Sequence, residues 1–130
     1  MAAPDKIRVF LVDDVTELRL LVRLTLEEDP EIEVVGEASD GHAGVEGVAE
    51  TQPDVVLLDL SMPDMDGLQA IPQIREGDPE VAIIVLSGFS ADRMSGPALE
   101  RGADGYVEKG TPIQELRDAT RTAVASRRGD

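Results

Sequence analysis

The sequence predicts an α/β fold, in which a parallel five-stranded sheet carries helices on both faces. Five short apolar runs alternate with five stretches of helical periodicity along the 130 residues, which is the pattern of repeated strand–helix units. Three of the runs, among them Val9–Val12 and Val55–Leu58, are nearly continuous in apolar residues rather than alternating. Such runs are typical of strands covered on both faces. Parallel neighbours need crossover connections, and the helical stretches between the runs provide them.

The expected elements follow one another in strict alternation. The first apolar run is rich in β-branched residues, and the later runs are interpreted in the same way. Proline or glycine follows several helical stretches, as at Pro30, Pro53, Pro79 and Gly102, and marks where the helix before it ends. The expected strands are Ile7–Val12, Ile32–Ala38, Asp54–Leu60, Val81–Leu86 and Ala103–Glu108, and the expected helices are Val15–Glu28, Asp40–Thr51, Gly67–Glu76, Ala91–Arg101 and Pro112–Ser126.

The first helix has two sets of apolar residues. Leu20 and Leu24 are four residues apart and lie off the main stripe, so they either form a docking surface for a partner protein or pack against the last helix. The main stripe, expected to face the core, consists of Leu18, Leu21, Val22 and Leu26.

Two prolines fall inside expected helices. Proline is tolerated best at the first position of a helix, and Gly96-Pro97 interrupts the fourth one. We therefore expect the regular part of that helix to begin near Pro97, which leaves residues 89–96 loose or turn-like. Pro72 lies within the third helix, where it is expected to bend the first turns, and this either disturbs the loop that carries Ser61 or only moves the start of the helix.

The composition excludes several classes of function. The chain has 27 acidic and 12 basic residues, and a net charge of −15 opposes binding to nucleic acid. The absence of cysteine excludes disulfides, thiolate zinc sites and a thiol nucleophile, and fits a cytoplasmic protein. The longest apolar runs have four or five residues, too few to span a membrane. We expect one domain over residues 1–130, with an ordered core of about 5–127 and loose ends at residues 1–4 and 127–130.

Polar residues follow the strands at the edge of the sheet where their carboxyl ends meet. Asp13 and Asp14 follow the first strand, Asp59 the third, Ser87 the fourth and Lys109 the fifth. Ligands of such sheets bind beyond these strand ends. Three carboxylates repel one another unless a cation joins them, and oxygen-only ligands suit magnesium. A lysine and a hydroxyl opposite them indicate phosphoryl transfer onto a carboxylate.

Four motifs carry a resemblance to a known family: VFLVDDV (9–15), VVLLDLSMPDMDG (55–67), IIVLSG (83–88) and GADGYVEKG (102–110). In this order and spacing, over nearly the whole chain, the sequence resembles the receiver domain of bacterial two-component response regulators. The resemblance implies a flavodoxin-like (βα)5 three-layer sandwich with strand order 2-1-3-4-5. GADGYVEKG and IQELRDATR are similar to the members that often carry a C-terminal helix-turn-helix of the NarL and LuxR type. Gly110 stands where many members have proline.

The resemblance also implies a role for each residue at the strand ends. Asp59 matches the aspartate that accepts a phosphoryl group from the phosphohistidine of a sensor histidine kinase. Lys109 would bind a phosphoryl oxygen. Ser87 and Tyr106 match the switch residues, whose movement alters the surface formed by the fourth helix, fifth strand and fifth helix. The implied cofactor is Mg²⁺, with Asp13, Asp14, Asp59 and the main-chain carbonyl of Ser61 as its ligands.

The implied function is a phosphorylation switch rather than a turnover enzyme, although the domain would catalyse its own phosphorylation and dephosphorylation. The implied partner is a sensor histidine kinase docking at Leu20 and Leu24, and a second copy of the chain is a candidate partner through the switch surface. His42 is expected to face solvent and not to serve as a phosphodonor. Neither nucleic acid nor a membrane is an expected partner of this chain. Whether it acts alone or was separated from an output domain stays open.

Two alternative functions fit part of this pattern. A degenerate receiver could act as a constitutive interaction module, but the complete set of acids, serine and lysine argues against it. A phosphatase of the aspartyl-phosphate type needs a second acid two residues after the nucleophile, and here that position is Ser61.

Overall fold

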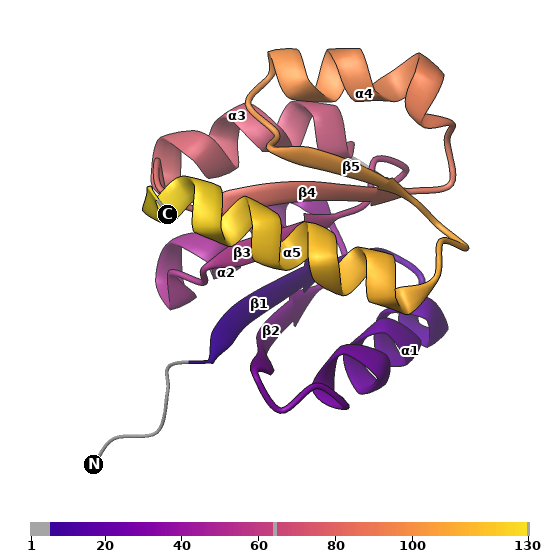
Figure 1. Cartoon of the computed structure of the whole chain (residues 1–130). Coiled ribbons are helices and arrows are strands. Elements are labelled where there is room, and N and C mark those ends of the chain that lie inside the picture. The colour runs from indigo at the N-terminus through magenta and orange to yellow at the C-terminus, as the bar shows by residue number, and fades with distance from the viewer. Residues whose placement is uncertain (1–5, 64, 130) are drawn as a thin grey trace.

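The computed structural model describes residues 6–63 and 65–129, which form one parallel sheet in the order β2-β1-β3-β4-β5 with a helix after each strand (Figure 1). The expected fold and strand order are confirmed. Most observed ends lie within two residues of the expected ones. The elements are β1 (Ile7–Val12), α1 (Thr16–Glu27), β2 (Ile32–Ala38), α2 (Gly41–Thr51), β3 (Val55–Leu58), α3 (Gly67–Gly77), β4 (Ala82–Ser87), α4 (Ala91–Glu100), β5 (Gly105–Glu108) and α5 (Ile113–Arg128).

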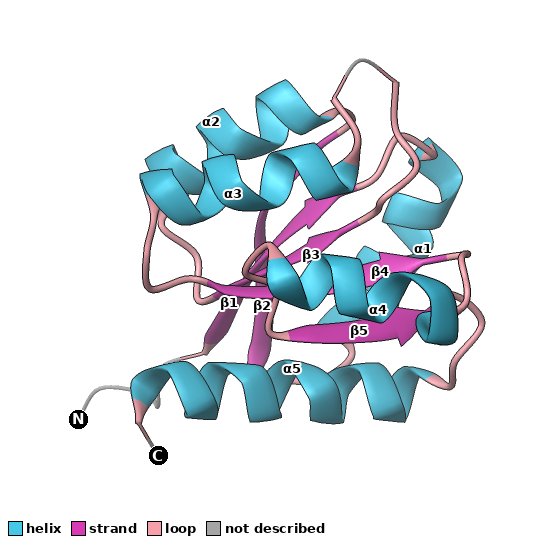
Figure 2. Ribbon diagram, turned by 90° about the horizontal axis from the view of Figure 1, so that it is seen from above, coloured by secondary structure: helices cyan, strands magenta, loops and turns pink. Residues whose placement is uncertain are grey.

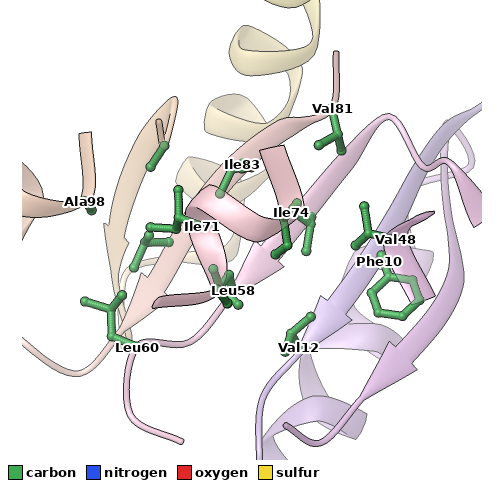
Figure 3. Close-up of a cluster of buried hydrophobic side chains, with 14 of the residues drawn as sticks. Phe10, Val12, Val48, Leu58, Leu60, Ile71, Ile74, Val81, Ile83 and Ala98 are labelled. Carbon is green, nitrogen blue, oxygen red and sulfur yellow. The ribbon is translucent and has the colours of Figure 1, made fainter. Parts of the chain in front are cut away.

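The helices form two layers, one on each face of the sheet. Figure 2 shows α2 and α3 on one side of the sheet and α5 on the other. Each face has its own hydrophobic core. The core under α2, α3 and α4 (Figure 3) contains Phe10, Val12, Val48, Val56, Leu58, Ile71, Ile74, Ile83, Val85 and Ala98. The core under α1 and α5 contains Val9, Leu11, Leu26, Val34, Val55, Leu57, Ile84, Leu116 and Val124.

A β-bulge interrupts the pairing of β1 with β2. Val9 pairs with Val34, but the next residue, Phe10, pairs with Gly36, so that Val35 is an extra residue in β2. A Cβ at Gly36 would lie 2.6 Å from a ring carbon of Phe10, which explains a glycine at this position. Because the bulge shifts the alternation of side chains by one residue, Glu37 faces α1.

The expectation for the fourth helix is wrong. The helix α4 begins at Ala91 and contains Pro97 in its interior. Met94 and Ala98, four residues apart, both pack against the core under this helix, as residues on one face of a continuous helix do. Burial therefore outweighs the backbone hydrogen bond that proline removes. The helix α3 starts at Gly67, so Pro72 does not move its start.

Two further expectations need correction. Leu21 belongs to the expected core stripe of α1 but is 61% exposed, whereas Leu26 is fully buried. The C-terminal residues 127 and 128 are not loose, because α5 continues to Arg128 and Arg127 forms an ion pair with Asp104 over 2.8 Å. The expected loose end at residues 1–4 lies outside the described residues. Within the described residues, no helix is both long enough and apolar enough to cross a membrane.

Candidate functional site

Three aspartates meet at the carboxyl edge of the sheet. Asp13 and Asp14 follow β1, and Asp59 follows β3, the strand that pairs with β1. Each of them offers a carboxylate oxygen within 4.8 Å of the other two. Main-chain hydrogen bonds extend the sheet into this edge: the Asp59 amide donates to the Val12 carbonyl (2.9 Å) and the Asp13 amide to the Ala38 carbonyl (3.1 Å). The sheet itself therefore holds the carboxylates together.

Lys109 lies between two of these carboxylates. Its Nζ is 3.1 Å from Asp13 Oδ2 and 3.3 Å from Asp59 Oδ2. Burial lowers the pKa of Lys109, but hydrogen bonds and charge interactions with the two aspartates raise it. The interactions with the aspartates outweigh the effect of burial, and the net shift is upward. Lysine 109 is therefore an ammonium ion at neutral pH. Gly110 follows with φ +92°, a backbone conformation that proline at this position could not adopt.

Asp59 is the most deeply buried of the three aspartates. Burial raises the pKa of its carboxyl, Lys109 lowers it, and the nearby Asp13 raises it again, with a net upward shift. Asp13 is also buried, whereas Asp14 is exposed. A donor set made only of carboxylate oxygens, with one side open to water, fits Mg²⁺.

The start of α3 packs directly on the main chain that follows Asp59. The Gly67 amide donates to the Leu60 carbonyl (3.0 Å), and a Cβ at Gly67 would lie 2.4 Å from the main-chain oxygen of Asp59. Only glycine permits this approach. A capping box formed by Asp66 and Gln69 fixes the first turn of the helix. The loop from β3 to α3 is therefore held at both of its ends.

The other predicted site residues lie around this centre. Ser87 is fully buried at the end of β4, and its main-chain carbonyl accepts a hydrogen bond from the Lys109 amide (2.7 Å). The amide of Ser61 donates to Asp59 Oδ1 (3.3 Å). Tyr106 on β5 is half-buried and lies further along the sheet. Its hydroxyl reaches the loop after Ser87 at Phe89.

The structure thus brings Asp13, Asp14, Asp59 and Lys109 together, as the strand ends predicted. His42 is exposed, as expected. Sequence reasoning missed two residues beside the acids, Gly67 and Arg19. The glycine at the end of the 55–67 motif was a signal for the first. For Arg19, only its place one turn after the aspartate pair could have drawn attention.

Comparisons with known proteins agree with this geometry. The family model for the response regulator receiver domain matches residues 9–121. The chain is 44% identical over 117 residues to the transcriptional regulatory protein LiaR of Bacillus subtilis, covering 90% of this chain and 56% of LiaR. It is 36% identical over 115 residues to the response regulator protein VraR of Staphylococcus aureus, covering 88% and 55%. The chain therefore spans about half the length of these curated relatives.

Solved structures lead to the same family. A LuxR-family two-component response regulator from Aurantimonas sp. SI85-9A1 superposes with a TM-score of 0.89 and 33% identity, covering 95% of this chain and 88% of the other. The signal receiver domain of the response regulator NarL from Mycobacterium tuberculosis, described as putative, gives 0.85 and 31%, covering 98% and 100%. The strand order, the acidic edge and these matches together place the chain in the family of response regulator receiver domains.

Proposed function

We propose that this chain is a phosphorylation switch whose phosphoacceptor is Asp59. The observation that carries the proposal is the position of Lys109, whose ammonium group lies within 3.3 Å of a buried Asp59 and 3.1 Å of Asp13. A lysine held there can bind an oxygen of a phosphoryl group on Asp59 and offset its charge. The donor is a phosphohistidine of a sensor histidine kinase.

The transfer needs one bond to form and one to break. A carboxylate oxygen of Asp59 attacks phosphorus, the bond between phosphorus and the imidazole nitrogen breaks, and the imidazole leaves with the electron pair. Asp13, Asp14, Asp59 and the main-chain carbonyl of Ser61 would hold Mg²⁺. When bound, this ion supplies positive charge beside the phosphoryl oxygens. Burial of Asp59 removes water from the nucleophile before the reaction.

The signal then passes to the surface of α4, β5 and α5. Ser87 turns its hydroxyl to the new phosphoryl group and gives up its contact with the Phe89 amide, which is 3.2 Å long in this structure. Tyr106 contacts the same loop, so that a shift of the loop alters its position. The chain acts on itself, including its own dephosphorylation, and does not turn over a separate substrate.

The exposed leucines of α1 are the proposed docking surface for the kinase. Leu20 and Leu24 are 53% and 58% exposed, which leaves much of their surface open to a partner. Leu21 enlarges the patch. We place this exchange in the cytoplasm, and propose control of transcription as its output, as the name of LiaR suggests for that relative. A second copy of the chain docking on α4, β5 and α5 is a further proposed partner.

The first experiment measures intact mass after incubation with acetyl phosphate, with and without Mg²⁺. We expect a single phosphoryl adduct on the wild type that requires Mg²⁺ and is absent from Asp59→Asn. Asp92→Asn, which changes an exposed acid on α4, is the matched control and should be phosphorylated normally. No adduct from acetyl phosphate or from a phosphorylated histidine kinase would overturn the proposal in favour of a constitutive interaction module.

Docking is tested separately with Leu20→Ser and Leu24→Ser. Transfer from a kinase that phosphorylates the wild type should slow, whereas labelling by acetyl phosphate should not change, since the small donor needs no docking surface. Equal slowing with both donors would indicate damage to the site instead.

A further inference from the structure

Arg19 on α1 contacts the main chain of the acidic cluster. Its Nη1 donates a hydrogen bond to the Asp13 carbonyl oxygen over 2.6 Å, and its Nε donates to Glu37 Oε1 over 3.1 Å. The side chain is only 15% exposed. One guanidinium thus joins α1, the end of β2 and the peptide that links Asp13 to Asp14.

This contact completes the fixation of Asp13. The Asp13 amide is bound by Ala38, its Oδ1 accepts from the Val15 amide (2.9 Å), and its Oδ2 faces Lys109. The remaining polar group of the residue is its carbonyl, which Arg19 holds. The Asp13 carbonyl and the Asp14 amide belong to the same planar peptide unit. The orientation of this carbonyl therefore sets the direction of the backbone at Asp14, the exposed aspartate.

Glu37 offsets the charge that Arg19 brings to this place. It binds Arg19 through Oε1 and Arg23 through Oε2, the latter over 2.6 Å. The bulge at Val35 is what turns Glu37 toward α1. A cation close to a metal site would normally repel the metal, but here the carboxylate of Glu37 pairs with Arg19 and offsets its charge.

We infer that Arg19 is a positioning residue for magnesium binding and hence for phosphoryl transfer to Asp59. The inference rests on the proposed function. Arg19 acts through the Asp13–Asp14 peptide and does not touch the metal or the phosphoryl group. Arginine suits the task because its planar fork of donors reaches a carbonyl and a carboxylate at the same time.

Three roles of Arg19 predict different magnesium affinities. If Arg19 positions the ligands, its removal weakens binding, as loss of groups behind metal ligands generally does. If it acts only through its charge, removal of a cation beside the acids tightens binding. If it only ties α1 to β2, the melting temperature falls and the Kd for Mg²⁺ stays the same.

The test is titration of the full chain with MgCl2 by calorimetry, with thermal unfolding of each variant in parallel. For Arg19→Gln we expect the Kd to rise by about 10-fold. Arg23→Gln is the matched control, because Arg23 lies one turn further along α1 and binds the same Glu37 without contacting Asp13. Its Kd should stay unchanged or fall slightly.

Labelling by acetyl phosphate gives a second readout. The Arg19→Gln variant should be labelled slowly at low Mg²⁺ and recover as Mg²⁺ approaches saturation. Should that variant fail to fold, Arg19→Lys replaces it, since lysine keeps the charge but cannot reach both partners, and its Kd should rise too. An unchanged or lower Kd in a folded Arg19 variant overturns the inference. A wild type that binds no Mg²⁺ would instead overturn the proposed function itself.

Discussion

The hydroxyl of Tyr106 donates a hydrogen bond to the main-chain carbonyl of Phe89 over 2.8 Å. The amide of the same Phe89 donates to Ser87 Oγ. One residue of the loop between β4 and α4 is therefore held from both sides, by the predicted switch serine and by the predicted switch tyrosine. Movement of either side chain releases one of these two bonds to Phe89.

Replacing Tyr106 by phenylalanine should loosen the loop without unfolding the domain. The lost hydrogen bond is exposed, so the free energy of unfolding should fall by about 1 kcal/mol or less. Amides of residues 88–91 should exchange faster with solvent, as measured by hydrogen exchange and mass spectrometry, while those of α2 serve as the internal control. Unchanged exchange at 88–91 would mean that the tyrosine does not order the loop.

Asp59→Asn should stabilise the protein at neutral pH in EDTA. Folding raises the pKa of this carboxyl above its ordinary 3.8, mainly through burial, so folding disfavours the ionised form. The penalty is complete above the folded pKa and disappears below 3.8, where both states are protonated. In thermal melts, the melting temperature of the variant should thus be a few degrees above that of the wild type at pH 7 and no higher than that of the wild type at pH 3. A lower melting temperature at pH 7 would contradict this.

Asp29→Asn should behave in the opposite way. The Glu31 amide and Arg121 both hydrogen-bond the Asp29 carboxylate and hold its pKa below the ordinary 3.8. Its contribution to stability is present above 3.8 and is lost as the pH falls through the folded pKa. Urea unfolding should show a loss of about 1 kcal/mol at pH 7, which shrinks toward zero in acid. A loss of equal size at both pH values would assign the effect to the geometry of the turn instead.

Gly96→Ala should stabilise α4. Apart from its chain neighbours and the nearby helix backbone, a Cβ at this position meets no atom within 4 Å, and alanine is favoured over glycine inside a helix by about 0.5–1 kcal/mol. Contact of the new methyl group with the ring of Pro97 should reduce this gain. The control is Gly102→Ala, which should destabilise because Gly102 has φ +116°. No gain from Gly96→Ala would mean that crowding by the ring of Pro97 offsets the helix preference of alanine.

Gly67→Ala should destabilise the protein and slow labelling of Asp59. The new methyl group would lie 2.4 Å from the Asp59 main-chain oxygen and 2.7 Å from Leu60 Cα, and these backbone atoms cannot move aside as easily as a side chain, so we expect a loss of about 1–3 kcal/mol. Gly77→Ala at the other end of α3 is the control, since its Cβ would make an ordinary 3.8 Å contact with Ala49. Equal stability of the two variants would show that the loop after β3 can yield.

Most of the site was predicted from the residue type that follows each strand. The carboxyl ends of parallel strands meet at one edge of the sheet, so polar residues placed after them come close together. Asp13, Asp59 and Lys109 illustrate this. The exposure of Leu21 and the continuity of α4 through Pro97 were beyond local rules, since the packing angle of a helix and the burial of Met94 and Ala98 decide them. The roles of Ser87 and Tyr106 came from resemblance and stay predictions.

The contact of Arg19 with Asp13 could not be predicted from the sequence, for a different reason. The contact depends on a bulge in β2, and the pattern of apolar and polar residues around Val35 does not predict this bulge. A regular strand would have turned Glu37 toward the opposite face and left Arg19 without its carboxylate.

The same bulge bears on how the protein behaves when it is concentrated. β2 is one of the two edges of the sheet, and an edge strand offers unpaired amides and carbonyls to any other extended chain. A bulge increases the local twist, and this strand also carries the exposed charge of Glu33. A twisted, acidic edge is a poor template for a strand from another molecule. The extra residue at Val35 therefore protects the sheet against edge-to-edge aggregation.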